Sequence, residues 1–109
     1  MVSLKGDTQI RNTPLFTPAA IGVYRYSAYM SVVGPSISGW ILSLLFEDLS
    51  GINVQTTLDV TPGASNKGWG NDGLFMFSPA VGVPVTFQLE QNGNPPLPYI
   101  MTFTIEQLQ

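Results

Sequence analysis

The chain has 109 residues, which is enough for one domain with its own hydrophobic core and too short for two such domains. It contains neither Cys nor His, which excludes disulfides, thiolate metal sites, cysteine nucleophiles and the usual acid–base group of neutral pH. Charged residues make up only 10% of it and the net charge is −3, and the scattered cations do not form the cluster that binds a nucleic-acid backbone.

Residues 1–16 are the first predicted segment, and their pattern indicates a short N-terminal arm or a short edge strand. Residues 1–12 mix polar and apolar side chains and contain no apolar run of the kind that makes a signal peptide. Pro14 and Pro18 fix φ and remove backbone donors, so the stretch around them is predicted to be an extended connector and not a central strand. We therefore expect an arm over 1–16 and a folded domain over 17–109.

The clearest predicted strand runs from Gly22 to Val33, because its apolar residues alternate with polar ones. After a turn over residues 34–39, residues 40–46 are almost continuously apolar, which is typical of a strand buried on both faces. The uncharged stretch 26–46 is long enough to span a bilayer, but the glycines and proline of the turn favour two strands over a membrane helix. We expect no membrane partner.

The rest of the chain predicts further strands separated by turns. Their expected ranges are 54–60, 74–77, 83–90 and 99–108. Between the first two of these, residues 61–73 contain four glycines and are predicted to form a long loop. Because turn signals recur every 8 to 12 residues or so, the chain is predicted to be an all-β antiparallel sandwich or jelly roll of about seven or eight strands.

The sequence predicts that the chain is not an enzyme and holds no cofactor. Serine hydrolases need a base, and the usual one, His, is absent. Glu47 and Asp48 are adjacent in a predicted hairpin turn, so as strand neighbours their carboxylates would point apart. Asp59 and Glu90 could pair across strands, but no pattern in the sequence locates a pocket around them.

Trp69 and Arg25 are candidates for contact with a partner or ligand. Trp69 lies in the predicted glycine-rich loop, where it is expected either to fold back and cap the sandwich or to contact a sugar or a protein. A calcium site in that loop is disfavoured, because calcium prefers six to eight oxygen ligands and the loop has one acid. Arg25 would stack on an aromatic ring, pair with a carboxylate at a subunit contact, or lie on the surface without a role.

The low charge content predicts that other protein chains cover part of the surface. The alternative is an uncharged surface that Ser, Thr, Asn and Gln side chains keep hydrated. Tyr, Trp and Met are enriched at protein interfaces. Tyr29, Trp40 and Met101 are therefore candidates for an intersubunit surface. The alternative is that the strand aromatics fill the single core of the domain.

Residues 18–29, which run PAAIGVYRYSAY, resemble the Gly-leu-Tyr-arg-x-Ser-x-Tyr strand of TNF/C1q-like jelly rolls in phage and bacterial proteins. Residues 98–106, PYIMTFTIE, are similar to the closing strand of the same group, and the resemblance spans most of residues 15–108. It implies a tight homotrimer whose closing-strand side chains lie near the threefold axis. Those side chains would be Tyr99, Met101 and Phe103.

Small free-standing members of this group look like phage capsid decoration, or cement, proteins. The resemblance implies that the chain binds the phage major capsid protein on the virion surface, with the 1–16 segment as the docking arm. The arm residues expected to make the contact are Leu4, Ile10, Arg11, Leu15 and Phe16. The alternative is a receptor- or carbohydrate-binding knob of a phage fibre or tailspike, with Trp69 exposed in a loop. A secreted sugar-binding module is disfavoured by the missing signal peptide.

Overall fold

The computed structural model describes residues 2–34, 38–62, 67–93 and 96–108. They form β1 (Val2–Gly6), β2 (Ile10–Phe16), β3 (Tyr24–Val33), β4 (Ser38–Glu47), β5 (Asn53–Gln55), β6 (Leu58–Val60), β7 (Lys67–Phe77), β8 (Val85–Gly93) and β9 (Tyr99–Gln107). No helix of the length and hydrophobicity needed to cross a membrane occurs among these described residues. The predicted all-β class is confirmed.

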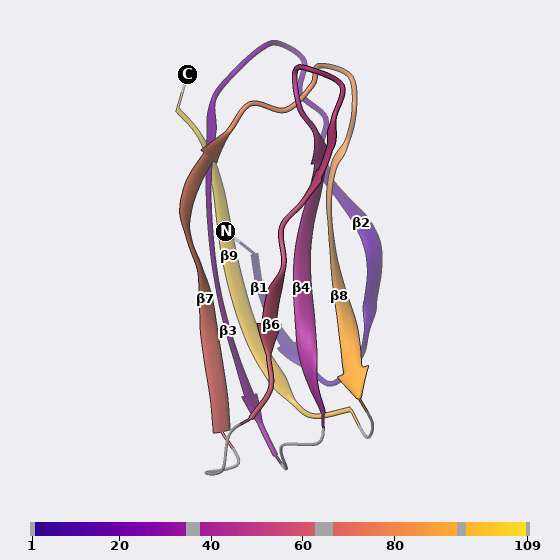
Figure 1. Cartoon of the computed structure of the whole chain (residues 1–109), viewed down its shortest axis with the longest axis vertical. Coiled ribbons are helices and arrows are strands. Elements are labelled where there is room, and N and C mark those ends of the chain that lie inside the picture. The colour runs from indigo at the N-terminus through magenta and orange to yellow at the C-terminus, as the bar shows by residue number, and fades with distance from the viewer. Residues whose placement is uncertain (1, 35–37, 63–66, 94–95, 109) are drawn as a thin grey trace.

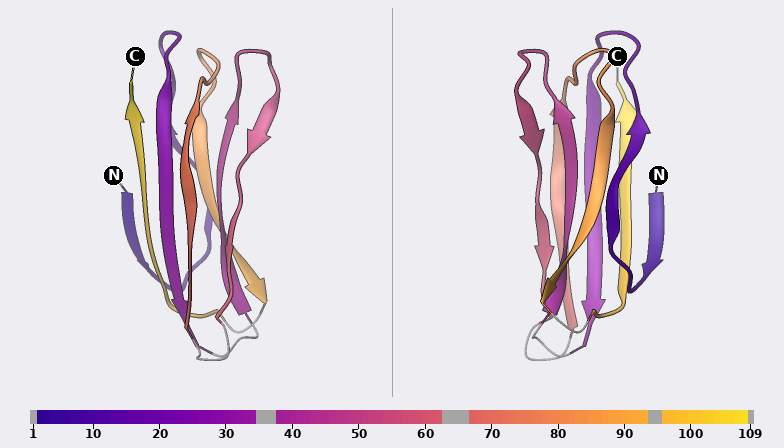
Figure 2. Two further views of the ribbon diagram at one scale, coloured as in Figure 1. Left: turned by 60° about the vertical axis from the view of Figure 1, so that its left-hand side comes forward. Right: turned by 90° about the vertical axis from the view of Figure 1, so that its right-hand side faces the viewer.

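The strands form two antiparallel sheets packed face to face (Figures 1 and 2). One sheet has the order β1-β9-β3-β7, and the other has the order β2-β8-β4-β5, with β6 pairing with the same strand β4. Among the nine described strands, every connection crosses from one sheet to the other except those from β4 to β5 and from β5 to β6. With β5 and β6 sharing one position beside β4, these strand orders are those of a jelly roll, as the sequence predicted.

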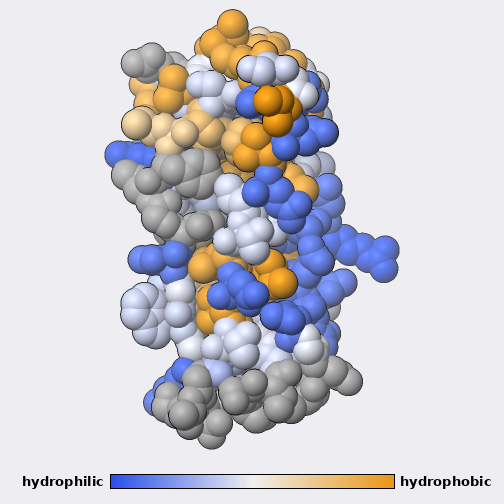
Figure 3. Space-filling view, viewed as in Figure 1, coloured by the Kyte–Doolittle hydropathy of each residue, from blue (hydrophilic) through white to orange (hydrophobic). Residues whose placement is uncertain are grey.

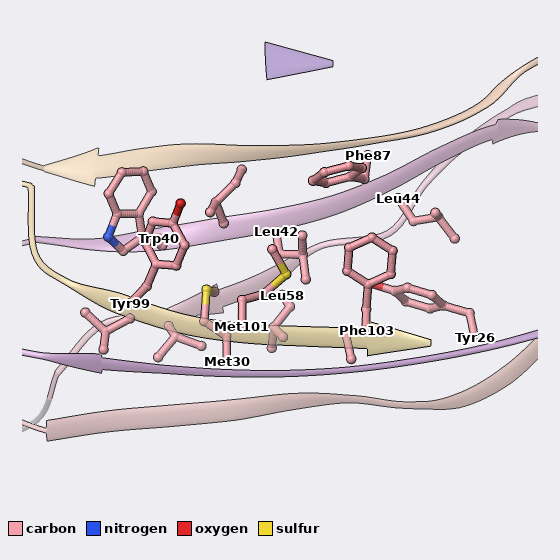
Figure 4. Packing of buried hydrophobic residues seen from close by; sticks show 14 of the residues in the cluster. Tyr26, Met30, Trp40, Leu42, Leu44, Leu58, Phe87, Tyr99, Met101 and Phe103 are labelled. Carbon is pink, nitrogen blue, oxygen red and sulfur yellow. The ribbon is translucent and has the colours of Figure 1, made fainter. Parts of the chain in front are cut away.

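The core lies between the sheets and is rich in aromatic rings (Figure 4). Trp40 of β4 packs edge-on against Tyr99 of β9 with their ring centroids 5.0 Å apart, and Phe87 of β8 lies 5.1 Å from Phe103 of β9. The indole N–H of Trp40 donates a buried 2.7 Å hydrogen bond to the Leu97 carbonyl. These contacts join the two sheets, and the burial of their rings stabilises the sandwich.

The expected intersubunit role is therefore wrong for four of its five candidate residues. Trp40, Tyr99, Met101 and Phe103 are each 4% exposed or less, because they face the second sheet of their own chain. The alternative interpretation, that strand aromatics fill the single core, is the correct one for them. Only Tyr29, which points outward from β3, keeps exposed surface.

The interpretation of residues 1–16 as an arm is also corrected. Val2–Gly6 pairs with β9 and Ile10–Phe16 pairs with β8, so both segments are edge strands of the domain. Four of the five expected docking residues, Leu4, Ile10, Leu15 and Phe16, pack against the core, and only Arg11 is exposed. The physical reason is that the apolar residues of this segment cover the open edge of the sandwich, where burial stabilises them.

The predicted loop over 61–73 is wrong from Lys67 onward, where β7 begins. Gly68 and Gly70 face inward, and a Cβ at Gly68 would lie 2.7 Å from the Thr61 carbonyl oxygen. At Gly70 it would lie 3.0 Å from the side chain of Val60. These glycines let the chain around β6 approach β7 closely, which is a known reason for glycine within a strand.

The other segment boundaries differ less from the prediction. The expected strand over 54–60 is two short strands, β5 and β6, that both pair with β4. Between them, Thr56 binds Leu44 twice, through its amide N–H at 2.9 Å and its hydroxyl oxygen at 3.2 Å. Residues 35–37 and 63–66 of the predicted turn and loop lie outside the described residues, as do 94–95.

Candidate functional site

Exposed aliphatic side chains gather at one end of the sandwich, which we call the apolar end. Its members are Ile21, Leu49, Ile52, Val81 and Leu108. They come from the loops at the end of the molecule where the C-terminus lies, and hydrophobic surface is concentrated there (Figures 1 and 3). The side chain of Ile21 is 74% exposed and that of Ile52 is 60% exposed. Exposed apolar clusters are typical of surfaces through which small domains contact other molecules.

Backbone hydrogen bonds hold the loops of the apolar end together. The Gly82 amide donates to the Pro18 carbonyl at 2.9 Å, and the Ala80 amide donates to the Glu47 carbonyl at 2.7 Å. The Leu108 amide donates to the Val23 carbonyl at 2.7 Å, which fixes the end of β9 to the segment before β3. The end is therefore prearranged, and a partner that covers it pays little entropy to order these loops.

The turn between β4 and β5 is stabilised by one side chain. An oxygen of the Asp48 carboxylate accepts hydrogen bonds from the amides of Ser50 at 2.8 Å and Ile52 at 3.0 Å. Gly51 adopts a φ of 81°, a conformation that favours glycine, and its amide donates to the Asp48 carbonyl. The predicted hairpin role of Asp48 is confirmed, and the turn presents Ile52 to the solvent.

A second candidate surface is the outer face of the β1-β9-β3-β7 sheet, which we call the aromatic face. The strand register places two rows of outward side chains side by side across it. One row runs Trp69, Ser31, Ile100 and Lys5, and the next runs Asn71, Tyr29, Thr102 and Ser3. The rings of Tyr29 and Trp69 are stacked, with centroids 6.4 Å apart and planes 26° from parallel.

A hollow of about 430 Å³ adjoins the Trp69 row. Its lining residues are Lys5, Gly6, Asp7, Ser31, Val33, Pro98, Tyr99 and Ile100. The Tyr99 hydroxyl donates a 2.9 Å hydrogen bond to the Thr8 carbonyl. Burial, and to a smaller extent the nearby Asp7 carboxylate, raise the pKa of the Tyr99 phenol above its usual value. Tyr99 therefore stays protonated and fixes the turn between β1 and β2 at the edge of this hollow.

The structure bears on the alternatives that the sequence left open for Trp69 and Arg25. Trp69 is 70% exposed on a strand, so it does not cap the sandwich. Its two neighbours in β7, Gly68 and Gly70, take the inward positions, and Trp69 therefore points outward. Arg25 pairs with the Glu106 carboxylate across β3 and β9 of the same chain, and both side chains are partly exposed. Pairing with a carboxylate, one of the alternatives for Arg25, therefore occurs within the chain and not at a subunit contact, and such exposed pairs contribute little to stability.

The remaining carboxylates are dispersed over the described part of the chain. Asp59 and Glu90 flank Ile41 on opposite sides, so they lie two strand spacings apart, about 10 Å. Asp59 accepts a 3.3 Å hydrogen bond from the Asn92 amide group. A hollow of about 470 Å³ over β4, β5 and β8 has Glu47 as the ionisable group among its described lining residues. No group of three or more metal-ligating acids occurs among the described residues.

The comparisons with known proteins assign no family to this chain. No family model matches it, and no curated protein matches it. One solved structure that the chain matches weakly contains the CBM22-1 and GH10 modules of the Clostridium thermocellum endo-1,4-beta-D-xylanase 10B complexed with xylohexaose. The TM-score is 0.44 and the identity 14%, over 90% of this chain and 19% of that one. The chain thus spans about a fifth of that protein, and a similarity this weak transfers neither a ligand nor an activity.

Proposed function

We propose that the chain is a structural virion protein, a non-catalytic capsid decoration or cement protein that binds the major capsid lattice through its apolar end. The observation that carries the proposal is the cluster of exposed aliphatic side chains on hydrogen-bonded loops at one end of the sandwich. The low charge content supports it, because few like charges oppose close packing on a neighbouring protein. In this proposal the loops replace the N-terminal arm as the docking element.

The binding energy of one apolar end is modest, which favours an oligomer. Complete burial of one aliphatic side chain is worth about 1.5–3 kcal/mol, and the members of the end are already partly buried. Association costs roughly 4–15 kcal/mol in lost freedom of motion. Linked copies avoid most of this cost after the first contact, so a homo-oligomer binds a repeating lattice far more tightly than one copy does.

A homotrimer, which the resemblance implies, remains the proposed oligomer. Its contact uses surface other than Tyr99, Met101 and Phe103, because these three side chains fill the core of the monomer. A protein that binds only the assembled lattice stabilises it by the free energy of binding at each site. The proposed localisation is the outer surface of the capsid, and the proposed partners are further copies of the chain and the major capsid protein.

The non-catalytic part of the proposal follows from the side chains present. The sequence has no His and no Cys, and the two hollows described above hold no pair of facing carboxylates among their described lining residues. Asp48 accepts hydrogen bonds from backbone amides, which engages its carboxylate in the structure of a turn. This role of Asp48 is structural, and it involves no proton transfer to a ligand.

Cosedimentation with capsid shells tests the proposal. Shells assembled from the major capsid protein of the virus that encodes the chain are mixed with the purified protein and pelleted. We expect saturable binding at a fixed ratio to the capsid subunit and a higher disruption temperature of the shells. Protein that stays in the supernatant at every concentration, or that leaves the disruption temperature unchanged, contradicts the proposal.

A double variant identifies the surface used. Ile21→Asp with Ile52→Asp places two charges in the apolar end and is expected to weaken binding about a hundredfold. Val33→Asp is the matched control, since Val33 is a similarly exposed aliphatic residue at the edge of the aromatic face. Equal loss of binding in both variants would show that charge alone, and not the apolar end, governs the association.

A second candidate function, the carbohydrate- or receptor-binding knob, is favoured by a different observation. Trp69 and Tyr29 form an exposed aromatic pair away from the apolar end. A knob would use this pair to bind its ligand, and its loops would then be free of any lattice contact. Carbohydrate or receptor binding that Trp69→Ala abolishes, in a wild-type protein that does not bind capsid shells, would favour the knob.

A further inference from the structure

Trp69 and Tyr29 make up an exposed aromatic pair on rigid strands. Trp69 is 70% exposed and Tyr29 is 42% exposed, although rings of this size contribute most to stability when they are buried. Both belong to neighbouring strands of a four-stranded sheet, so the positions of the rings are set by the strand register and not by a loop. A ligand that covers them meets surface that is already ordered.

Most side chains next to the rings are small and polar, and Ile100 is an exposed aliphatic member of the Trp69 row. Tyr29 lies in register between Asn71 and Thr102, and Ser31 lies in register between Trp69 and Ile100. A hydroxyl or amide group therefore stands beside each ring. This combination of flat apolar surface and nearby hydrogen-bonding groups is typical of small-molecule sites.

Ser31 also belongs to the lining of the 430 Å³ hollow, which extends the aromatic surface toward β1. Lys5 and Asp7 contribute one cation and one anion to this lining. The rows that include Trp69 and Tyr29 cross four strands, a width of about 14 Å. The surface can thus hold an extended ligand that stacks at one side and forms hydrogen bonds at the other.

We propose that the aromatic face binds a neutral oligosaccharide, with one sugar ring stacked on Trp69 and the next units directed across Ser31 into the hollow. The C–H groups on the face of a pyranose ring complement an indole ring, and its peripheral hydroxyls complement Ser31, Lys5 and Asp7. This inference goes beyond the proposed capsid function, because it assigns a ligand to a surface that the capsid contact leaves open. It deepens the second candidate function, because it names the class of ligand for the same aromatic pair.

The charges of the face argue against other occupants. Nucleic acids need several clustered cations, whereas Lys5 is offset by Asp7 within the hollow. A stable protein contact buries about 800 Å² on each partner around an apolar centre, whereas these rings are bordered by Ser, Thr and Asn side chains. A neutral sugar chain is the ligand whose chemistry fits both the rings and the polar groups.

Affinity electrophoresis in native gels that contain soluble neutral polysaccharides tests the inference. The probes are xylan, mannan, mixed-linkage β-glucan and galactan, with polygalacturonate as the acidic comparison. We expect at least one neutral polysaccharide to retard the wild-type protein, and Trp69→Ala to weaken this binding about tenfold or more. Tyr29→Ala is expected to weaken it by a smaller factor.

Met76→Ala is the matched control, because Met76 is exposed on the same strand and carries no ring. It should be retarded as strongly as wild type. Trp69 is exposed, so the thermal midpoint of Trp69→Ala should match wild type and show that the variant is folded. In solution, binding should also shift the emission of Trp69, identified as the difference between the wild-type and Trp69→Phe spectra.

Three results would overturn the inference. They are no retardation by any neutral polysaccharide, equal retardation of wild type and Trp69→Ala, and retardation by polygalacturonate alone. Each is distinguishable from failure of the proposed function, because capsid cosedimentation is measured separately and depends on the apolar end. Capsid binding that survives in Trp69→Ala would show that the two surfaces act independently.

Discussion

The apolar end and the aromatic face are both exposed and rich in large side chains, but they are built differently. The apolar end consists of aliphatic residues on loops, which backbone hydrogen bonds tie together. The aromatic face consists of rings on paired strands, with small polar residues between them. In our proposals the first provides apolar area for another protein, and the second provides flat rings with hydrogen-bonding neighbours for a sugar. Two surfaces with similarly exposed side chains can therefore suit different kinds of partner, depending on the chemistry of those side chains.

The largest expected effect distinguishes the buried tryptophan of the core from the exposed tryptophan of the aromatic face. Trp40→Ala removes a fully buried ring and the hydrogen bond to Leu97, and should lower the free energy of unfolding by about 3–5 kcal/mol. Trp69→Ala should change it by less than about 0.5 kcal/mol, because most of that ring is in solvent. Urea unfolding of both variants checks this. Similar losses for the two would mean that Trp69 is part of the core.

A smaller effect is expected from a larger side chain in the tightly packed space beneath the aromatic face. Gly70→Val places side-chain atoms where a Cβ alone would lie 3.0 Å from Val60 and 3.1 Å from Leu58. The expected loss is about 1–3 kcal/mol from overpacking, and the Tyr29–Trp69 stack should be disturbed. Asn71→Val puts the same side chain on the outer side of β7 and should be nearly neutral. Near-UV circular dichroism and thermal unfolding would distinguish the two variants.

The corresponding change at the apolar end is Asp48→Ala. It removes the acceptor of the Ser50 and Ile52 amides, and we expect a loss of about 1–2 kcal/mol in stability. Hydrogen exchange at the Ile52 amide should become faster, while exchange in β7 stays unchanged. Asp59→Ala removes an exposed carboxylate outside this turn and serves as the control. Slow exchange at Ile52 in Asp48→Ala would mean that other contacts order the loop.

The smallest expected effect concerns Tyr99, at the edge of the hollow. Its pKa is raised in the folded state by burial and, to a smaller extent, by Asp7, so folding favours the protonated phenol. This contribution is complete below about pH 10, the unfolded pKa, and is lost as the pH rises through the folded pKa. Tyr99→Phe should cost about 1 kcal/mol at pH 7 through the lost bond to Thr8. Its stability should then fall less than that of wild type between pH 9 and pH 11, measured by urea unfolding, and an equally steep fall would contradict the assignment.

Alternation in the sequence predicted the sandwich well, because strands with one buried face repeat every second residue. It also placed Tyr99, Met101 and Phe103 on one face correctly. Alternation does not say what covers that face, and the second sheet of the same chain covers it, not a neighbouring subunit. Trp40 of β4 packs against Tyr99 from the second sheet, and it lies far from Tyr99 in the sequence. A local pattern therefore does not reveal this contact.

The aromatic face was the part of the site that the sequence predicted least well. Gly68 and Gly70 suggested a loop because glycine permits turns, but here glycine serves a close approach between β6 and β7 within the fold. The periodic placement of Lys67, Trp69 and Asn71 between these glycines was the signal that could have revealed a strand. Residues 1–16 were predicted to be an arm because a local pattern does not show a distant partner. The partner of β1 is the last strand of the chain.

Binding isotherms on one preparation of capsid shells test the central claim most directly. Wild type, Ile21→Asp with Ile52→Asp, and Trp69→Ala are titrated side by side, with the pelleted fraction measured at each concentration. If the apolar end is the docking surface, the double variant binds about a hundredfold more weakly and Trp69→Ala binds like wild type. Wild-type affinity in the double variant would contradict the claim.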